Sequence, residues 1–243
     1  MKIIGRTDVG RVRANNEDAL AWDEQFGFAV LADGMGGLLA GEVASRAAVD
    51  AVGEGLKVQS IDTTVVTACI DQANNQVRLL AADGNSLGNM GTTLVLWARS
   101  GSGRCIVAHV GDSRAYRYRD FRLFRLTSDH SVVQGMVNDG LMTPEEAQVA
   151  PNRNIITRAL GLEPTVAAEV VELDFEPGDR FLLCSDGLSN MLPQSDLEAI
   201  LNEAQWITGE AANSCPGAAD KLLAAANEAG GTDNISLVLI VPG

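Results

Sequence analysis

The sequence predicts an α+β fold whose strands form antiparallel sheets. Four strand-like segments follow one another between residues 92 and 127, and short turns such as the one at residues 101–103 join them. Short turns connect antiparallel strands, because a parallel pair needs a crossover of about a dozen residues or more. Two segments with the apolar spacing of helices precede these strands. The pattern rules against a doubly wound parallel sheet.

The first half of the chain predicts strands that lead into two helices. A short strand begins the chain and ends at a turn around Gly10, and a strand pair follows at residues 19–22 and 26–32. Apolar side chains then recur at helical spacing over residues 42–57 and 63–82. We expect these two helices to pack against a sheet.

The middle of the chain predicts the antiparallel strands and then a flap. The expected strands span residues 92–98, 104–110, 114–119 and 122–127. Residues 128–165 are polar, and a capping box with proline at Thr143 starts one short helix within them. A mostly irregular segment of this length inside a compact domain is usually functional. We therefore interpret residues 128–165 as a flap.

The end of the chain alternates strands and helices. The expected elements are a strand at 180–184, helices at 194–202 and 217–229, and a last strand at 235–241. Gly230 and Gly231 end the second of these helices. No Pro- or Ser-rich linker divides the sequence, so we expect one domain over residues 1–243.

Composition limits the partners and the location. The net charge of −14 disfavours nucleic acid and anionic membranes, because both are bound through Lys and Arg. The four cysteines lack CxxC spacing, which favours reduced thiols over a disulfide framework or a zinc site. The N-terminus has no signal-peptide core, and no stretch approaches the roughly 20 apolar residues of a membrane span. We expect a cytoplasmic monomer.

Each of four apolar strands has an aspartate at one of its ends. The segment Ala29–Gly37 runs from a strand into Asp33 and a glycine-rich turn, Asp112 and Asp186 follow two later strands, and Asp233 precedes the last one. An Asp-Gly pair after a strand is often only a turn. Because an aspartate recurs at the end of four strands, we expect the four side chains to converge at one end of the sheets. There the carboxylates repel one another unless cations neutralise them.

A polar cluster, Asn15–Asp18, precedes the strand that carries Asp33. Alone it indicates a solvated loop. Beside Asp33, its Glu17 and Asp18 become candidates for contacts around the same site.

Carboxylate oxygens without paired His or Cys favour Mg²⁺ or Mn²⁺ over Zn²⁺. Two such ions a few ångströms apart can share a carboxylate and a water molecule, lower the pKa of that water, and direct it at a phosphoryl centre. The hypothesis from the residues is metal-dependent hydrolysis of a phosphate ester.

A series of short motifs occurs in the order seen in a known enzyme family. The motifs are Gly10-Arg11-Val12-Arg13 with Asn16-Glu17-Asp18, Ala32-Asp33-Gly34-Met35-Gly36-Gly37 with Gly41-Glu42, Gly91-Thr92-Thr93, Val110-Gly111-Asp112-Ser113-Arg114, Asp129-His130-Ser131, Thr157-Arg158-Ala159-Leu160-Gly161, Cys184-Ser185-Asp186-Gly187-Leu188 and Gly231-Thr232-Asp233-Asn234. They span nearly the whole chain. The sequence resembles the metal-dependent serine/threonine protein phosphatases of the PPM (type 2C) family, in their compact bacterial form.

The resemblance implies a four-layer α-β-β-α sandwich of two antiparallel sheets flanked by helices, with the metal centre at one end. It implies that Asp33 bridges two Mn²⁺ or Mg²⁺ ions and that the carbonyl of Gly34 binds one of them. Asp186 and Asp233 would hold the other ion. Asp112, with Asp186, matches a weaker third site of bacterial members.

The resemblance also implies roles for residues near the N-terminus. Glu17 and Asp18 would act through metal-bound water molecules. Arg13 matches the arginine that grips the substrate phosphate, a task that suits the fork of a guanidinium. Together with Asp33, Asp186 and Asp233, Arg13 is expected to be catalytic.

The implied activity is hydrolysis of phosphoserine and phosphothreonine in proteins by a metal-activated water molecule. The implied partners are phosphoproteins, including a cognate bacterial serine/threonine kinase and its substrates. Two alternatives stay open: a phosphatase devoted to one regulatory partner, such as an anti-sigma-factor antagonist, and a catalytically silent phosphoprotein-binding module. Phosphate release from a phosphothreonine peptide, with and without manganese, separates the silent module from the phosphatases.

The sequence departs from the family at the expected proton donor. Family members carry a histidine just after the Asp-Gly-Met-Gly-Gly run or directly after Asp-Gly, where this chain has Leu38 and Met35. Of its two histidines, His109 lies within a strand as a core residue, and His130 stands at the base of the flap. We expect metal-bound water to protonate the leaving group, with His130 as the alternative donor.

Overall fold

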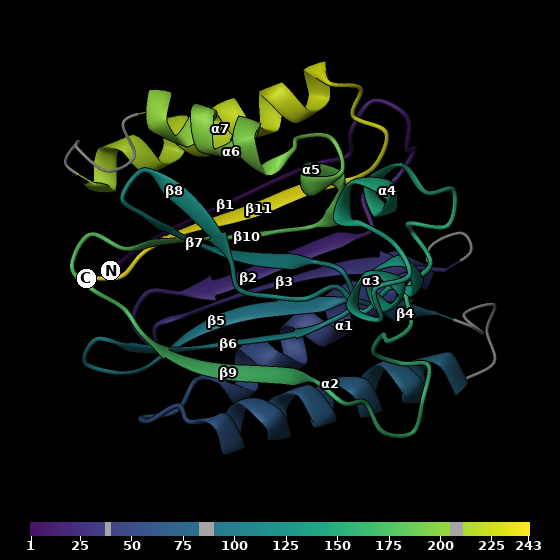
Figure 1. The fold of residues 1–243 in the computed structure, drawn as a ribbon. Helices are drawn as coiled ribbons and strands as arrows, with labels where there is room; N and C mark the ends of the chain where they lie inside the picture. Colours follow the sequence, from purple (N-terminus) through teal and green to yellow (C-terminus); the bar gives the residue numbers. More distant parts are fainter. Residues whose placement is uncertain (37–39, 83–89, 205–210) are drawn as a thin grey trace.

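The computed structural model describes residues 1–36, 40–82, 90–204 and 211–243, and of residues 211–215 it describes the backbone alone. Two antiparallel sheets pack face to face, and helices cover the outer side of each sheet (Figure 1). The layers follow the order helices, sheet, sheet, helices. This is the four-layer sandwich that the family resemblance implies.

Both ends of the chain lie in the five-stranded sheet. Its strand order is β1 (Lys2–Asp8), β11 (Ile235–Val241), β10 (Arg180–Cys184), β7 (Arg114–Arg119) and β8 (Arg122–Arg125). The six-stranded sheet has the order β2 (Asp18–Asp23), β3 (Phe28–Met35), β5 (Leu94–Gly101), β6 (Arg104–Val110) and β9 (Glu169–Asp174), and β4 (Gly91–Thr92) pairs with the end of β3. All strand pairs recorded for the described residues are antiparallel.

Four long helices form the outer layers. The pair α1 (Ala40–Gly55) and α2 (Thr63–Ala82) covers the six-stranded sheet, and α6 (Gln194–Glu203) with α7 (Ala211–Glu228) covers the other sheet (Figure 1). Three short helices, α3 (Val132–Asn138), α4 (Pro144–Val149) and α5 (Asp186–Ser189), lie towards one end of the sandwich (Figure 1).

Alternation along β3 fills two separate cores. Phe28, Val30 and Ala32 pack with the helix layer, while Ala29 and Leu31 pack between the sheets. Successive side chains of a strand point to opposite faces, so a strand between a helix layer and a second sheet is apolar at every position. This is why the strands that carry the aspartates read as unbroken apolar runs.

The predicted bounds of α2, β6, β7, β10 and β11 agree with the structure. Three elements that the sequence does not predict are α3, α5 and β9. The predicted start of the last helix at residue 217 was wrong. The helix begins at Ala211 and contains Pro216, which sequence reasoning treats as a boundary.

Two expectations from the composition concern membrane segments and cysteines. None of the helices in the described ranges combines the length and apolarity that crossing a membrane requires. Cys69, Cys105 and Cys184 are buried free thiols. Burial raises the pKa of Cys105 and of Cys184 to about 12, so both stay protonated at neutral pH. The side chain of Cys215 lies outside the described residues.

Candidate metal centre

Strand ends from both sheets bring the predicted aspartates together. Asp33 lies near the end of β3, and Asp18 at the start of β2 is its paired neighbour. Asp112 follows β6 in the same sheet, whereas Asp186 follows β10 and Asp233 precedes β11 in the other sheet. The charges of the other four carboxylates all act on Asp33. The five carboxylates therefore meet at one end of the sandwich.

Burial and mutual repulsion destabilise the charged forms of these groups. Burial raises the pKa of Asp33 well above its usual range, and the four neighbouring carboxylates raise it further. Burial also raises the pKa of Asp18 to about 7, although hydrogen bonds from two serines oppose the shift. Burial and a neighbouring carboxylate raise the pKa of Asp112 to about 7 and raise that of Asp186 as well. Without a cation, the site favours protonated carboxyl groups near neutral pH.

Two threonines hold the backbone of Asp33. The Oγ1 of Thr92 donates a hydrogen bond to the Asp33 carbonyl at 2.9 Å. The backbone N–H of Asp33 donates to the Oγ1 of Thr93 at 3.0 Å. The Thr93 hydroxyl is also bonded to the hydroxyl of Ser113 at 2.7 Å, directly beside Asp112. These bonds fix the end of β3 relative to the end of β6.

Gly34 follows Asp33 where three backbone segments meet. Its N–H donates to the Glu17 carbonyl at 3.1 Å. A Cβ at this position would lie 2.0 Å from the Gly41 carbonyl oxygen and 2.7 Å from that of Glu17. Only glycine fits, because any side chain would push the start of α1 away from the aspartates.

Asp18 contributes a carboxylate oxygen without a partner. The Ser185 hydroxyl donates to its Oδ2 at 3.0 Å and accepts from the Ser236 N–H at 3.0 Å. The Oδ1 of Asp18 is buried, and no described residue forms a hydrogen bond with it. Leaving such an oxygen unpaired is costly. The orphaned oxygen and the all-oxygen donor set both fit hard divalent cations with their water ligands.

Arg13 and Glu17 lie at the solvent side of the cluster. The Nη2 of Arg13 is 2.8 Å from Asp233 Oδ2, and 54% of the Arg13 side chain is exposed. Burial opposes the charge of Arg13, but the carboxylates of Asp233, Glu17 and Asp33 outweigh it and raise the arginine's pKa. Burial raises the pKa of Glu17, and Arg13 lowers it in turn. The guanidinium is thus held charged beside the aspartates.

Asn234 has a positioning role that sequence analysis did not assign. Its Oδ1 accepts from the Glu17 N–H at 2.8 Å. Its Nδ2 donates to the carbonyls of Val9 at 3.0 Å and of Asn15 at 2.8 Å. These bonds tie the loop that carries Arg13 and Glu17 to β11. The only signal in the sequence was its place next to Asp233.

His109, His130 and Glu169 form a second cluster, with one ligand atom of each within 4.8 Å of the others. The Gly111 N–H donates to Nδ1 of His130 at 3.1 Å, so the proton of the neutral ring is on Nε2, which lies 3.1 Å from Glu169 Oε1. The His109 Nε2 donates to the Ser128 carbonyl at 2.7 Å, and the two rings stack at 4.6 Å. This tautomer leaves His130 no lone pair for a cation.

The same contacts argue against His130 as the proton donor of the reaction. Nδ1 accepts from the Gly111 N–H, and Nε2 lies 3.1 Å from both Glu169 Oε1 and Arg158 Nη1, so both ring nitrogens are engaged. Burial lowers the pKa of His130, which disfavours the charged form that would donate. Leu38 lies outside the described residues, and Met35 ends β3. The identity of the proton donor therefore stays a prediction.

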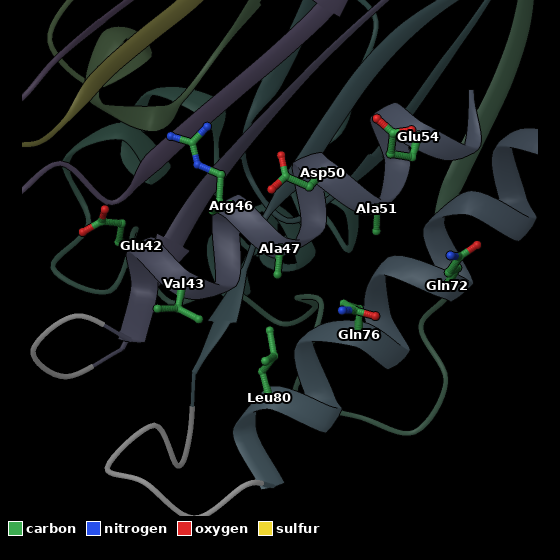
Figure 2. Close-up of a pocket in the computed structure, with 10 residues that line it drawn as sticks. All are labelled: Glu42, Val43, Arg46, Ala47, Asp50, Ala51, Glu54, Gln72, Gln76 and Leu80. Atoms are coloured by element: carbon green, nitrogen blue, oxygen red, sulfur yellow. The ribbon is translucent and has the colours of Figure 1, made fainter. Parts of the chain in front are cut away.

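A groove of about 710 Å³ lies on the outer side of the α1–α2 pair. Figure 2 shows Val43 and Ala47 of α1 facing Leu80 of α2 across it, and Ala51 further along on the side of Gln76. The small alanines leave this space open between the two helices. None of the five aspartates lines the groove, so it is separate from the metal centre.

Comparisons with known proteins identify the family of the chain. The family model described as Protein phosphatase 2C matches residues 9–224. The chain is 36% identical to the serine/threonine phosphatase stp of Listeria monocytogenes, over 97% of this chain and 93% of that protein. It is also similar to the crystal structure of the Mycobacterium tuberculosis serine/threonine phosphatase PstP/Ppp, with a TM-score of 0.87 and 35% identity over 98% of this chain and 97% of that one.

A further solved structure contains metal. It is the catalytic domain of the serine/threonine protein phosphatase PstP in complex with two manganese ions, with a TM-score of 0.84 and 35% identity over 98% of this chain and 96% of that one. The match of the family model and the identity to named phosphatases both cover nearly the whole chain. The chain belongs to the protein phosphatase 2C (PPM) family, and it is a phosphoprotein phosphatase.

Proposed function

We propose that this phosphatase hydrolyses phosphoserine and phosphothreonine at a centre of two Mn²⁺ or Mg²⁺ ions, with a third ion bound more weakly. We further propose that it opposes a bacterial serine/threonine kinase. The observation that carries the proposal is the convergence of five carboxylates beside Arg13. Four of the carboxylates have a raised pKa, because their negative charges are buried close together, where divalent cations would neutralise them.

In this proposal, the Asp33 carboxylate, the Gly34 carbonyl, Asp186 and Asp233 would hold the two tightly bound ions, so each sheet would contribute ligands. Asp112 and Asp186 form the weaker third site. Glu17 and Asp18 act through water ligands, which agrees with the unpartnered Oδ1 of Asp18.

Bound divalent cations lower the pKa of a water molecule and stabilise the charge that develops on the phosphoryl group. The chain's own contribution is to hold the carboxylates in place through Thr92, Thr93 and Ser185. Arg13 orients the phosphate, because its planar fork matches two phosphate oxygens. Its ion pair with Asp233 is largely exposed and therefore weak, so a phosphate can compete for the guanidinium.

The comparisons support the substrate and the cofactor. The relative from Listeria monocytogenes is named a serine/threonine phosphatase, and one neighbouring structure contains two manganese ions. A phosphoserine or phosphothreonine substrate requires a kinase that produced it, which is the basis for an opposing kinase.

Phosphate release from a phosphothreonine peptide tests the proposal. We expect no release in EDTA, restored release with Mn²⁺ or Mg²⁺, and little release from the matched phosphotyrosine peptide. Full activity in EDTA would contradict the metal centre. Binding of the phosphopeptide without release in Mn²⁺ would indicate a silent binding module instead.

A further inference from the structure

A second cavity, of about 730 Å³, borders the metal centre on the side of the flap. Asp112 and Asp186 line it, and so do residues of α3 and α4 in the flap. The flap supplies apolar side chains such as Val133 and Val137, and the body of the protein supplies Arg114 and Arg125. An occupant of this cavity would lie next to the phosphate that is hydrolysed.

Arg114 and Arg125 share a single carboxylate, that of Asp129. The Nη2 of Arg114 is 2.8 Å from Oδ2 of Asp129, and Nη2 of Arg125 bonds the other oxygen. The side chain of Asp129 is only 10% exposed, whereas those of Arg114 and Arg125 are 22% and 27% exposed. The shared anion is thus covered while both cations keep access to solvent.

Several hydrogen-bond donors of Arg125 have no partner among the described residues. Its Nη2 donates to Asp129, and its buried Nε has no hydrogen-bond partner among the described residues. Burial, and after it the charge of Arg114, lowers the pKa of Arg125, although Asp129 opposes the shift. A partly buried guanidinium with unused donors is stabilised by a further anion.

The charges that line the cavity favour such an anion. Its acidic residues are Asp112, Asp129 and Asp186, and its basic residues are Arg114, Arg125 and Arg153. Because Asp112 and Asp186 are metal ligands in the proposed function, Asp129 alone offsets three arginines. With cations bound to Asp112 and Asp186, the cavity is therefore basic, although the net charge of the chain is −14.

We propose that this cavity receives a second anionic group of the phosphoprotein substrate, a carboxylate or a phosphate, and that Arg125 is a specificity-determining residue. The inference rests on the proposed function. A cavity of this volume is on the order of 10 Å across, or about three residues of extended chain. The second anion should therefore lie about two to four residues from the phosphorylated one.

Wild-type enzyme tests this without any mutation. A phosphothreonine peptide flanked by alanines is compared with peptides in which one aspartate is moved through positions two to four on either side. A third set carries a non-hydrolysable phosphonate analogue of phosphothreonine at the same positions, which distinguishes carboxylate from phosphate. We expect one position to raise kcat/KM by roughly 5- to 20-fold, as for a partly exposed charge-assisted hydrogen bond.

Arg125→Gln tests the residue, and Arg122→Gln is the matched control. Arg122 lies on the same strand β8, is exposed, and does not line the cavity. Arg125→Gln should reduce the ratio of kcat/KM between acidic and neutral peptides to near one. Arg125→Lys should keep part of the preference, and Arg122→Gln should keep all of it.

Hydrolysis of para-nitrophenyl phosphate separates this inference from the proposed function. If neither that ester nor the neutral peptide is hydrolysed with Mn²⁺, the proposed function fails. If both are hydrolysed and no acidic position raises kcat/KM in wild type, the second-anion cavity is overturned. Equal losses on all substrates in Arg125→Gln, with wild-type thermal stability, would overturn the specificity role of Arg125.

Discussion

Asp33 lies among four other carboxylates, and its charged form is unstable in the metal-free protein. Burial, followed by the charges of its neighbours, raises its pKa. Asp33→Asn replaces a carboxyl group that is costly to ionise here with a neutral amide of the same shape. We expect the variant to lose nearly all phosphatase activity and yet to be at least as stable as wild type in EDTA at pH 8. Phosphate release measures the expected loss of activity, and thermal unfolding in EDTA measures the expected stability. A variant that melts well below wild type in EDTA would contradict the account of repulsion.

His109 provides a pH test outside the metal centre. Burial is the largest effect on the pKa of His109 and lowers it, and the charge of Arg125 lowers it further. The carboxylates of Glu169 and Asp129 raise the pKa, but the net shift is downward. The unfolded chain binds a proton at His109 below its ordinary pKa of about 6.5, whereas the folded chain resists it. The stability from the neutral ring is therefore fully present above that value and is lost as pH falls through the lowered folded pKa.

We expect the free energy of unfolding of wild type to approach that of His109→Gln as pH falls from 7.5 to 5. The slope for one proton is at most about 1.4 kcal/mol per pH unit. Urea unfolding at several pH values measures it. A difference between the two proteins that stays constant over this range would contradict the lowered pKa of His109.

Predictability from the sequence differs among the residues of the site. The aspartates are visible because each follows or precedes an apolar strand, and the motifs added Arg13 and Gly34. The roles of Ser185 and Asn234 were not visible, because they depend on hydrogen bonds to Asp18 and Glu17, far away in the chain. No local pattern encodes such pairs.

At the junction of β3 and α1, a close approach of backbones positions the ligands. Gly34→Ala would place a Cβ 2.0 Å from the Gly41 carbonyl oxygen. We expect a loss of about 1–3 kcal/mol in the free energy of unfolding, as for overpacked sites, together with weaker Mn²⁺ binding. Gly101→Ala at the end of β5 is the control, because a Cβ there meets nothing within 4 Å. Similar losses in both variants would show that close packing at Gly34 is not the cause.

The flap, residues 128–165, differs from the rest of the chain in its short elements. Exchanging it for the corresponding segment of a related phosphatase should change the preference among phosphopeptides and leave para-nitrophenyl phosphate hydrolysis nearly unchanged. The reason is that the flap lines the cavity beside the site, whereas none of the five aspartates belongs to it. Steady-state kinetics on both substrates measure the effect. Equal losses on both would mean that the flap builds the metal centre.

Among the secondary-structure elements, those with a strong apolar pattern were predictable, and so was the start of α4, because its capping box with proline is visible in the sequence. The elements α3, α5 and β9 were not predictable. The helix α2 has an apolar face at helical spacing, and the strands β6, β10 and β11 are buried at nearly every position. The strand β7 carries buried tyrosines between its arginines. The helix α3 depends on a single cap, in which Ser131 accepts from the Gln134 N–H. The edge strand β9 has no fully buried residue, so its sequence lacks the alternation of apolar and polar residues that marks a strand. Tertiary contacts decide such elements.

On the level of the whole molecule, the candidate metal centre lies where the two sheets meet. Asp33 and Asp112 come from the six-stranded sheet, and Asp186 and Asp233 come from the five-stranded one. The four-layer arrangement itself was inferred from the resemblance. Periodicity alone gave antiparallel strands and helices, because it does not specify which faces pack together.

Calorimetric titration of Mn²⁺ into the metal-free protein tests the central claim, that the converging carboxylates hold two divalent cations tightly and a third one weakly. We expect two tight binding events and one weak event in wild type. Asp112→Asn should lose the weak event alone, because in the proposed function Asp112 serves only the third site, whereas Asp33→Asn should lose tight binding. Unchanged tight binding in Asp33→Asn, or the loss of all binding in Asp112→Asn, would contradict this assignment of the ligands.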